Sequence, residues 1–237
     1  MIIQGATLSG VTVRDATLYN SGNMLLYLDA ANSTSYPRSG TTWYDLSGRT
    51  NNTTGTSNTT YSTNNGGYFN FVDPGWFTTN SAKYNVTYTG KTIFMAAKLA
   101  SAMGSSTYRC MFGSNGGNRN FNLYFYYTGS AYQLHFSSAG QGGLSSSMSY
   151  TPGNWGTFAI TQTTGGVLTY YYNGVQLGTA QTGVTFSQYL STTSENVGAS
   201  DNYWNGPISV TAIYGSALTA DQILQNHNAV RIRYGLS

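Results

Sequence analysis

Short runs of alternating apolar and polar residues follow one another through most of the chain. The runs NFNLYFYY (120–127) and YQLHFSS (132–138) are separated by the polar stretch TGSA. Alternation with a period of two predicts antiparallel strands that bury one face and expose the other. Tyr124 and Tyr126 are expected on the opposite face of their strand from the residues below. The residues expected on the buried faces are Phe121, Leu123, Phe125, Tyr127, Tyr132, Leu134 and Phe136.

Two further runs extend this β pattern. TIFMAAKLA (92–100) is almost continuously apolar, which is typical of a strand buried on both faces. In VLTYYYNGVQLGTA, Asn173 and Gly174 separate two runs and tolerate the positive φ of a type I′ turn, which predicts a hairpin. Residues 49–67 are polar and of low complexity, which predicts a surface loop with weak strands. Many short strands of this kind predict an all-β, antiparallel two-sheet jelly-roll sandwich.

The sequence predicts one helix, near the C-terminus, in SALTADQILQNHNAV. Thr219 and Gln222 have the spacing of a capping box, in which each side chain bonds the backbone N–H of the other residue. We expect this helix to lie against one end of the sandwich. The residues expected on its buried face are Ile223, Leu224, His227 and Val230.

The amino-acid composition limits the classes of molecule that the protein is expected to bind. Only 7% of the 237 residues are charged, and the net charge is +3. The basic residues are scattered along the chain, whereas nucleic-acid-binding proteins concentrate them on one face, so we expect no nucleic-acid partner. No apolar run has the length of a membrane span, and the N-terminus lacks the pattern of a signal peptide. The single cysteine, Cys110, excludes a disulfide within the chain and is expected to be buried.

The first 23 residues differ from the rest of the chain. Residues 1–23 alternate apolar and polar positions, with glycine breaks, outside the pattern of the main domain at 24–237. Two interpretations stay open. The segment is either an extra edge strand of the main domain or an arm that docks on a partner or a neighbouring subunit, because exposed strands are natural pairing surfaces.

The stretch MLLYLDAANSTSYPRSGTTWYDLSG (24–48) holds two of the seven acidic residues, Asp29 and Asp45, next to aromatic residues. Paired carboxylates among aromatic rings are typical of glycosidases. No glutamate lies nearby, however, and the two residues fall in separate turns. We therefore predict that each carboxylate accepts backbone N–H bonds in its own turn, and that Trp43 packs on the sandwich.

The order of the motifs carries a family resemblance. LYLDA, SYP and WYDLSG occur near the start, and YWNGPIS, IYGSALTADQILQNHNA and RYG occur near the end. In these motifs residues 24–237 resemble the laminin-G-like branch of the concanavalin A-like lectin/glucanase superfamily, in the versions common in tailed bacteriophages. The resemblance implies a jelly-roll sandwich. Because members of the superfamily bind glycans, hydrolyse them or serve as virion-surface modules, fold alone does not determine function.

The residues argue against an enzyme. The hydrolytic branch of the superfamily carries an E-x-D-x-x-E strand motif, and this chain has one glutamate, Glu195, with Asp201 as the nearest acid. A glycosidase needs two closely spaced carboxyl groups. His135 on a strand and His227 on the helix are interpreted as structural, and no nucleophile elbow or zinc motif occurs.

Sugar sites combine an aromatic platform with amide and carboxylate hydrogen-bonding groups. The candidate carbohydrate-binding residues are Trp76, Asp201, Asn202, Tyr203 and Trp204. For Trp204 the alternative is packing against the sheet edge. Calcium is common in the superfamily, and Asp73 is a second candidate oxygen ligand beside Asp201, but the sequence defines no calcium site and we expect no obligatory cofactor.

These observations predict a non-enzymatic structural protein at the virion surface of a tailed phage: a capsid decoration, head-fibre or tail-associated subunit. Its expected partners are other virion proteins, contacted through residues 1–23, and further copies of the chain, three of them if it forms a fibre. Host surface polysaccharide is a further expected ligand. The alternative is a carbohydrate-binding lectin module of a secreted or surface protein, and a glycoside hydrolase is the least favoured interpretation.

Overall fold

The computed structural model describes residues 18–19, 22–79, 88–114, 122–138, 141–185, 195–198 and 202–236. Most of the predicted arm, residues 1–23, therefore lies outside the described residues. Leu18 is buried, and the backbone N–H of Tyr19 donates to the Asn226 side chain at 2.7 Å. In the described part of the chain, no helix is both long and apolar enough to span a membrane.

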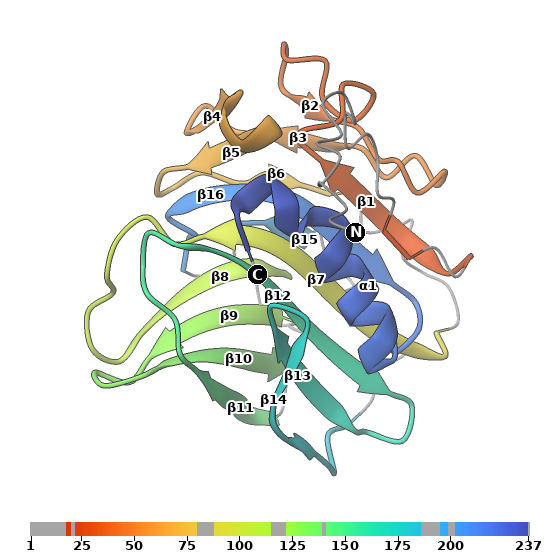
Figure 1. The fold of residues 1–237 in the computed structure, drawn as a ribbon, viewed down its shortest axis with the longest axis vertical. Helices are drawn as coiled ribbons and strands as arrows, with labels where there is room; N and C mark the ends of the chain where they lie inside the picture. Colours follow the sequence, from red (N-terminus) through yellow and green to blue (C-terminus); the bar gives the residue numbers. More distant parts are fainter. Residues whose placement is uncertain are drawn as a thin grey trace, which may run out of the picture.

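The structure is a sandwich of two antiparallel sheets (Figure 1). The first sheet has the order β14 (Val175–Gln181), β13 (Leu168–Tyr172), β12 (Trp155–Thr163), β7 (Gly90–Lys98), β16 (Gly206–Tyr214), β5 (Tyr68–Phe71) and β4 (Thr59–Ser62), and β1 (Met24–Asp29) also pairs with β16. The second sheet has the order β11 (Gln141–Met148), β10 (Tyr132–Ser138), β9 (Asn122–Tyr127), β8 (Thr107–Ser114), β15 (Glu195–Val197), β6 (Phe77–Thr78), β3 (Thr53–Gly55) and β2 (Thr42–Trp43). The predicted jelly-roll sandwich is confirmed.

Aromatic and aliphatic side chains fill the space between the sheets. Phe125 of β9 meets Phe158 of β12 edge-on at 4.8 Å between ring centroids. Trp43 of β2 is fully buried, as predicted, and lies 4.8 Å from Phe69 of β5. These pairs connect opposite sheets, so the alternation seen in the sequence becomes one continuous core.

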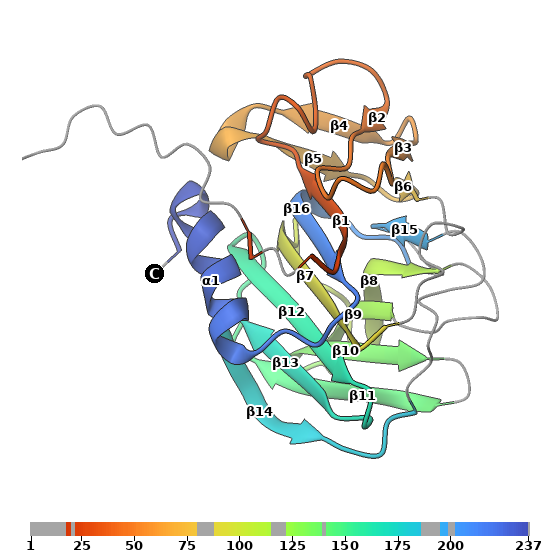
Figure 2. The same ribbon diagram turned by 90° about the vertical axis from the view of Figure 1, so that its right-hand side faces the viewer.

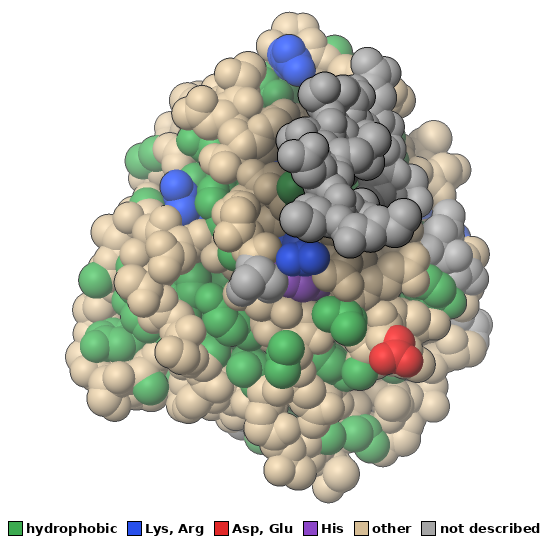
Figure 3. Space-filling model, in the orientation of Figure 1, with side chains coloured by type: hydrophobic (Ala, Val, Ile, Leu, Met, Phe, Trp, Pro, Cys, Tyr) green, Lys and Arg blue, Asp and Glu red, His purple; other side chains and the backbone are tan. Residues whose placement is uncertain are grey.

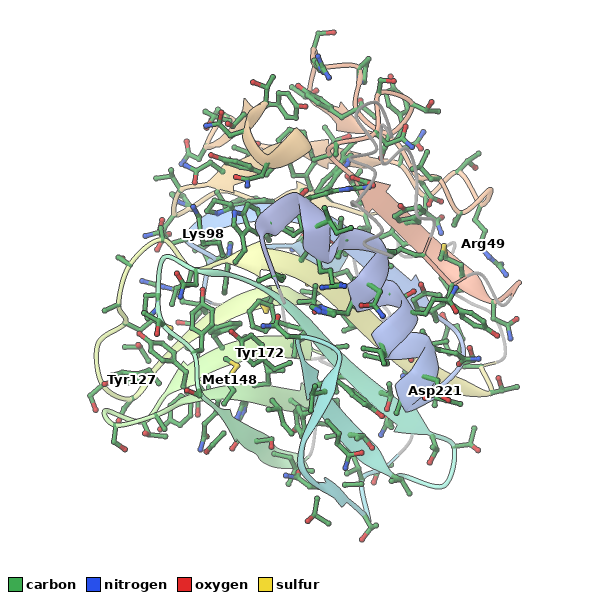
Figure 4. The ribbon with its side chains drawn as sticks, viewed as in Figure 1. Arg49, Lys98, Tyr127, Met148, Tyr172 and Asp221 are labelled. Carbon is green, nitrogen blue, oxygen red and sulfur yellow. The ribbon has the colours of Figure 1, made fainter. Side chains whose placement is uncertain are left out.

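Two local predictions are confirmed. Helix α1 (Ala220–Val230) begins after Thr219, whose side chain accepts from Gln222 N–H while the Gln222 side chain accepts from Thr219 N–H. Asp221, labelled in Figure 4, lies in the first turn, where a negative charge interacts favourably with the helix dipole. The β13–β14 hairpin turns at Asn173 and Gly174, which have φ angles of 49° and 78°.

The position of α1 differs from the prediction. The helix covers the outer face of the first sheet rather than one end of the sandwich, as Figure 2 shows. The Asn226 side chain donates to the Tyr214 hydroxyl at 3.0 Å, and His227 Nδ1 lies 2.9 Å from the Thr157 hydroxyl. Asn226 therefore belongs to the buried face, whereas Leu224 is 42% exposed. The period of the apolar residues predicted the helix correctly. The buried face of the helix is rotated toward Asn226, because polar side chains of the sheet beneath it bond Asn226 and His227.

Asp45 acts as the predicted turn clamp. Its carboxylate accepts from the backbone N–H groups of Tyr27, Ser47 and Asn51 and from the Ser47 hydroxyl, at 2.7 to 2.9 Å. One carboxylate thus ties the loop after β2 to strand β1.

Asp29 makes the predicted turn and a second contact that the sequence does not indicate. It accepts from Ala31 N–H at 3.0 Å, and both of its oxygens lie 2.8 Å from the Arg233 guanidinium. Arg233 belongs to the 3₁₀ turn η3 (Arg231–Tyr234), which follows α1. Burial alone lowers the pKa of Arg233, but the Asp29 carboxylate outweighs burial and raises it, so the guanidinium stays charged in the ion pair that joins β1 to the C-terminal segment.

Candidate functional site

The outer face of the second sheet carries an unusual number of aromatic side chains. On β9 and β10, Phe125 and Leu134 point into the core, so Tyr124 and His135 point to the opposite face of the sheet, where Tyr124 is packed among its neighbours and only 4% exposed. The strands pair Tyr124 with His135, and Tyr108 of β8 with Tyr126. The pleat of three neighbouring strands therefore gathers these rings on one face, opposite the face that α1 covers.

These outward rings surround a hollow. A cavity of about 220 Å³ is lined by Tyr108, Tyr124, His135, Ser137 and Asn202. The Tyr108 ring lies 5.0 Å from the His135 ring, nearly perpendicular to it, and stacks on Tyr126 at 4.3 Å. The hollow thus combines ring faces with hydroxyl, imidazole and amide groups, and its described lining contains no carboxylate, Lys or Arg.

Burial favours the neutral forms of two titratable groups in the hollow, His135 and Tyr108. Burial lowers the pKa of His135 to about 4. Burial, and then the neighbouring Tyr126, raise the pKa of Tyr108 above its usual value. Near pH 7 the hollow therefore offers uncharged donors and acceptors. Gly143 of β11 lies against the His135 ring, and a side chain at Gly143 would collide with that ring.

The loop before β16 places one predicted site residue at the hollow. The Asn202 carbonyl accepts from Cys110 N–H at 2.8 Å, which holds the loop on β8, and Asn202 lines the hollow. The expectation of glycan contact by Trp204 is corrected, because its side chain is fully buried and packs edge-on against Phe125 at 5.1 Å. Trp204 instead anchors the loop in the core, which is the packing alternative that the sequence left open.

The structure brings Trp76 and Tyr203 together. Their half-buried rings stack at 5.5 Å with an angle of 30°. Trp76 Nε1–H donates to the Thr78 hydroxyl at 3.0 Å, which fixes the orientation of the indole. Two of the predicted aromatic residues therefore form one surface, and one of them, Tyr203, directly follows Asn202 in sequence.

The described residues do not fit the calcium site considered from the sequence. Asp201 lies outside them. The Asp73 carboxylate faces Arg109 at 3.8 Å, and a neighbouring cation opposes metal binding. Among the residues that the structure describes, no group of three or more His, Cys, Asp or Glu side chains could hold a metal ion.

Sequence reasoning missed Tyr108, Tyr124, His135 and Ser137 as site residues. The alternation did predict that Tyr124 lies on the opposite face of its strand from Leu123 and Phe125. The missing information was the pairing of β8, β9 and β10, which brings residues distant in sequence to one hollow.

A second hollow lies on the other side of the molecule, near the C-terminus. It has a volume of about 360 Å³ and is lined by residues of β12, β13 and the segment after α1, among them Trp155, Tyr172 and Tyr234. Tyr172 is labelled in Figure 4. Trp155 and Tyr234 stack on each other at 4.3 Å and both are more than nine-tenths buried, so neither offers an open ring face.

The face shown in Figure 3 is dominated by uncharged groups with isolated charges.

Solved structures show the same fold at low sequence identity. The binding domain of botulinum neurotoxin DC, in complex with rat synaptotagmin II, superposes with a TM-score of 0.66 and 14% identity over 88% of this chain and 52% of that chain. Trypanosoma rangeli sialidase gives a TM-score of 0.65 and 14% identity over 90% of this chain and 33% of that chain. The chain thus spans about half the length of the neurotoxin domain and a third of the sialidase.

A search of curated proteins finds no significant sequence match. A family model for the concanavalin A-like lectin/glucanases superfamily matches residues 75–224, well over half of the chain. The match includes β7 to β16, which carry the hollow, and it agrees with the lectin-like jelly roll of the structure. The chain belongs to the concanavalin A-like lectin/glucanase superfamily.

Proposed function

We propose that this protein is a non-enzymatic carbohydrate-binding module that holds an uncharged sugar in the hollow of the second sheet. The observation that carries the proposal is the hollow itself, in which Tyr108, Tyr124 and His135 surround a space that Ser137 and Asn202 also line. Aromatic rings cover the apolar face of a sugar, while hydroxyl and amide groups bond its hydroxyls and fix its orientation.

The charge of the hollow favours a neutral sugar over an acidic one. Its described lining carries no cationic side chain that could pair with a sugar carboxylate. The lowered pKa of His135 keeps that imidazole uncharged near pH 7. An acidic sugar would lose hydration without gaining an opposite charge, which is unfavourable in a partly buried site.

The absence of catalysis is part of the proposal. Several carboxylates of the described chain have structural partners: Asp29 binds Arg233, Asp45 binds backbone N–H groups, and Asp73 faces Arg109. A glycosidase needs two carboxyl groups at a defined separation beside the sugar. None of these three residues lines the hollow.

The structural neighbours support carbohydrate as the ligand class only at the level of fold. Cell entry of one of them, botulinum neurotoxin type C, depends on interaction with two ganglioside molecules. Another neighbour is a sialidase bound to an inhibitor. Because the identities are 14% and 12%, the residues that bind sugar here must be argued from this chain alone.

The test is binding of the purified protein to an array of neutral and acidic bacterial surface glycans, followed by calorimetry on the best ligand. We expect neutral glycans to bind, and Tyr108→Ala to weaken binding at least about tenfold, or ~1.4 kcal/mol. Tyr44→Ala is the matched control, because Tyr44 is 41% exposed and does not line the hollow. No binding to any glycan, equal effects of the two substitutions, or release of reducing ends would contradict the proposal.

We further propose that the module is displayed on a tailed-phage virion and attached through residues 1–23 as a homo-oligomer, trimeric in a fibre. The motif resemblance and the charge-poor composition support this setting. Light scattering of the full chain and of a variant lacking residues 1–23 tests the attachment. Oligomers that dissociate on truncation are expected, and monomers in both samples would count against it.

A further inference from the structure

The hollow and the Trp76–Tyr203 stack lie on the same face of the second sheet. Phe77 of β6 is buried in the core, so Trp76 and Thr78 point to the outer face, and their side chains are hydrogen-bonded there. Tyr124 and His135 are outward by the same alternation on β9 and β10. The two aromatic surfaces are therefore accessible to one ligand.

The order of strands gives the distance between the outer ends of the two surfaces. From β10 to β6 the sheet runs β10-β9-β8-β15-β6. Neighbouring strands lie ~4.8 Å apart, so His135 on β10 and Trp76 beside β6 are separated by roughly 19 Å across the sheet. This length exceeds a single sugar ring and matches a short linear chain of sugar units.

The hollow alone is too small for such a chain. Its volume is about 220 Å³. Sites that enclose drug-sized ligands have volumes of about 300–1,000 Å³. The hollow therefore accommodates one sugar ring, and the remaining units of a longer glycan must lie on the surface that leads to Trp76.

The loop that connects the hollow to the Trp76–Tyr203 stack is held in place by several contacts. Asn202 at the hollow and Tyr203 in the stack are consecutive residues. Their loop is fixed by the bond from Cys110 N–H to the Asn202 carbonyl. The buried Trp204 fixes it further, because its backbone N–H donates to the Gly198 carbonyl at 2.7 Å. The spacing of the two surfaces is thus set before any ligand binds, which lowers the entropic cost of binding a chain to both.

We propose that the ligand is a linear, uncharged oligosaccharide that lies across the strands, with one unit in the hollow and a later unit stacked on Trp76 and Tyr203. This proposal rests on the proposed function and defines its ligand as the interior of a polysaccharide. A chain that reaches both surfaces binds the second one as an intramolecular event, so its affinity rises steeply once it is long enough.

The test compares neutral gluco-, galacto- and manno-oligosaccharides, from monosaccharide to hexasaccharide, by calorimetry. For the series that binds, we expect the affinity to rise at least about tenfold between the monosaccharide and the longer chains. Trp76→Ala should abolish this increase with chain length, whereas Trp76→Phe, which keeps a ring, should retain most of it. Equal affinity for all lengths, or an equal effect of Trp76→Ala on every length, would overturn the proposal.

Intrinsic fluorescence gives a second measurement, independent of the stability of the variants. Of the four tryptophans, Trp43, Trp155 and Trp204 are at least nine-tenths buried, which leaves Trp76 as the partly exposed one. Long chains should shift the emission, monosaccharides should not, and Trp76→Phe should remove the shift. Binding of long chains without an emission change would overturn only the proposed contact of the glycan with Trp76 and Tyr203. Failure of all sugars to bind would reject the proposed function itself.

Discussion

The ion pair between Asp29 and Arg233 connects the two ends of the described chain. Its removal tests how much this contact contributes to the stability of the fold. The Asp29 side chain is 1% exposed and the Arg233 side chain 21% exposed. Arg233→Met removes the guanidinium that lies 2.8 Å from both carboxylate oxygens. The carboxylate then keeps two bonds, from Ala31 N–H and from the Tyr27 hydroxyl, but has no opposite charge.

The cost follows from leaving a buried charge unpaired. Removing one partner of a buried ion pair destabilises a protein by about 3–5 kcal/mol. Because Arg233 is partly exposed and Asp29 keeps two hydrogen bonds, we expect Arg233→Met to lower the free energy of unfolding by the lower end of this range, about 3 kcal/mol. Asp29→Asn should cost less, about 2 kcal/mol, since the remaining guanidinium can reach water. The double variant should cost less than the sum, because the two residues interact directly.

Urea unfolding measures these differences. With a slope of about 3 kcal/mol per molar urea, Arg233→Met should lower the midpoint by about 1 M. Arg231→Met is the matched control, because Arg231 lies in the same 3₁₀ turn and its guanidinium donates to the Leu236 carbonyl, at 3.5 Å, rather than to a buried carboxylate. Equal midpoints for the two variants, or a loss below about 1 kcal/mol as for surface pairs, would refute this reasoning.

Three further predictions concern single positions. Asp45→Asn should destabilise the fold by about 2 kcal/mol in urea unfolding, because the amide repeats only part of the carboxylate's hydrogen bonding, and it should leave glycan affinity unchanged. Gly143→Ala should weaken glycan binding in calorimetry without contacting sugar, because the new methyl group displaces the His135 ring. The lowered pKa of His135 means that the unfolded chain binds more protons between about pH 4 and pH 6.5, so stability should rise with pH across that window, and His135→Gln should flatten this slope in unfolding measured at several pH values.

The sequence predicted those features that depend on neighbouring residues. The β10 alternation, the Asn173-Gly174 turn and the Thr219 cap are each determined within a few positions, and the structure has all three. The turn role of Asp45 was also predictable, because an Asx-type turn needs only the residues that follow it.

Features that depend on pairing between distant segments were not predictable. Asp29 and Arg233 are 204 positions apart, and no local pattern indicates that they meet. The hollow likewise depends on the register that sets Tyr124 beside His135, and a shift of one residue would turn these side chains inward. Trp204 and Tyr203 are adjacent in sequence and both aromatic, and only the fold decides that Trp204 is buried while Tyr203 stays partly exposed and stacks on Trp76.

The chain has two histidines, and their positions allow a direct test of the binding site. His135 lines the hollow, whereas His227 belongs to α1 and is buried against the first sheet, on the other side of the molecule. In an NMR titration with a neutral oligosaccharide, the ring-proton resonances of His135 should shift in proportion to occupancy while those of His227 stay fixed. A sugar that binds without moving the His135 resonances would show that the hollow is not the binding site.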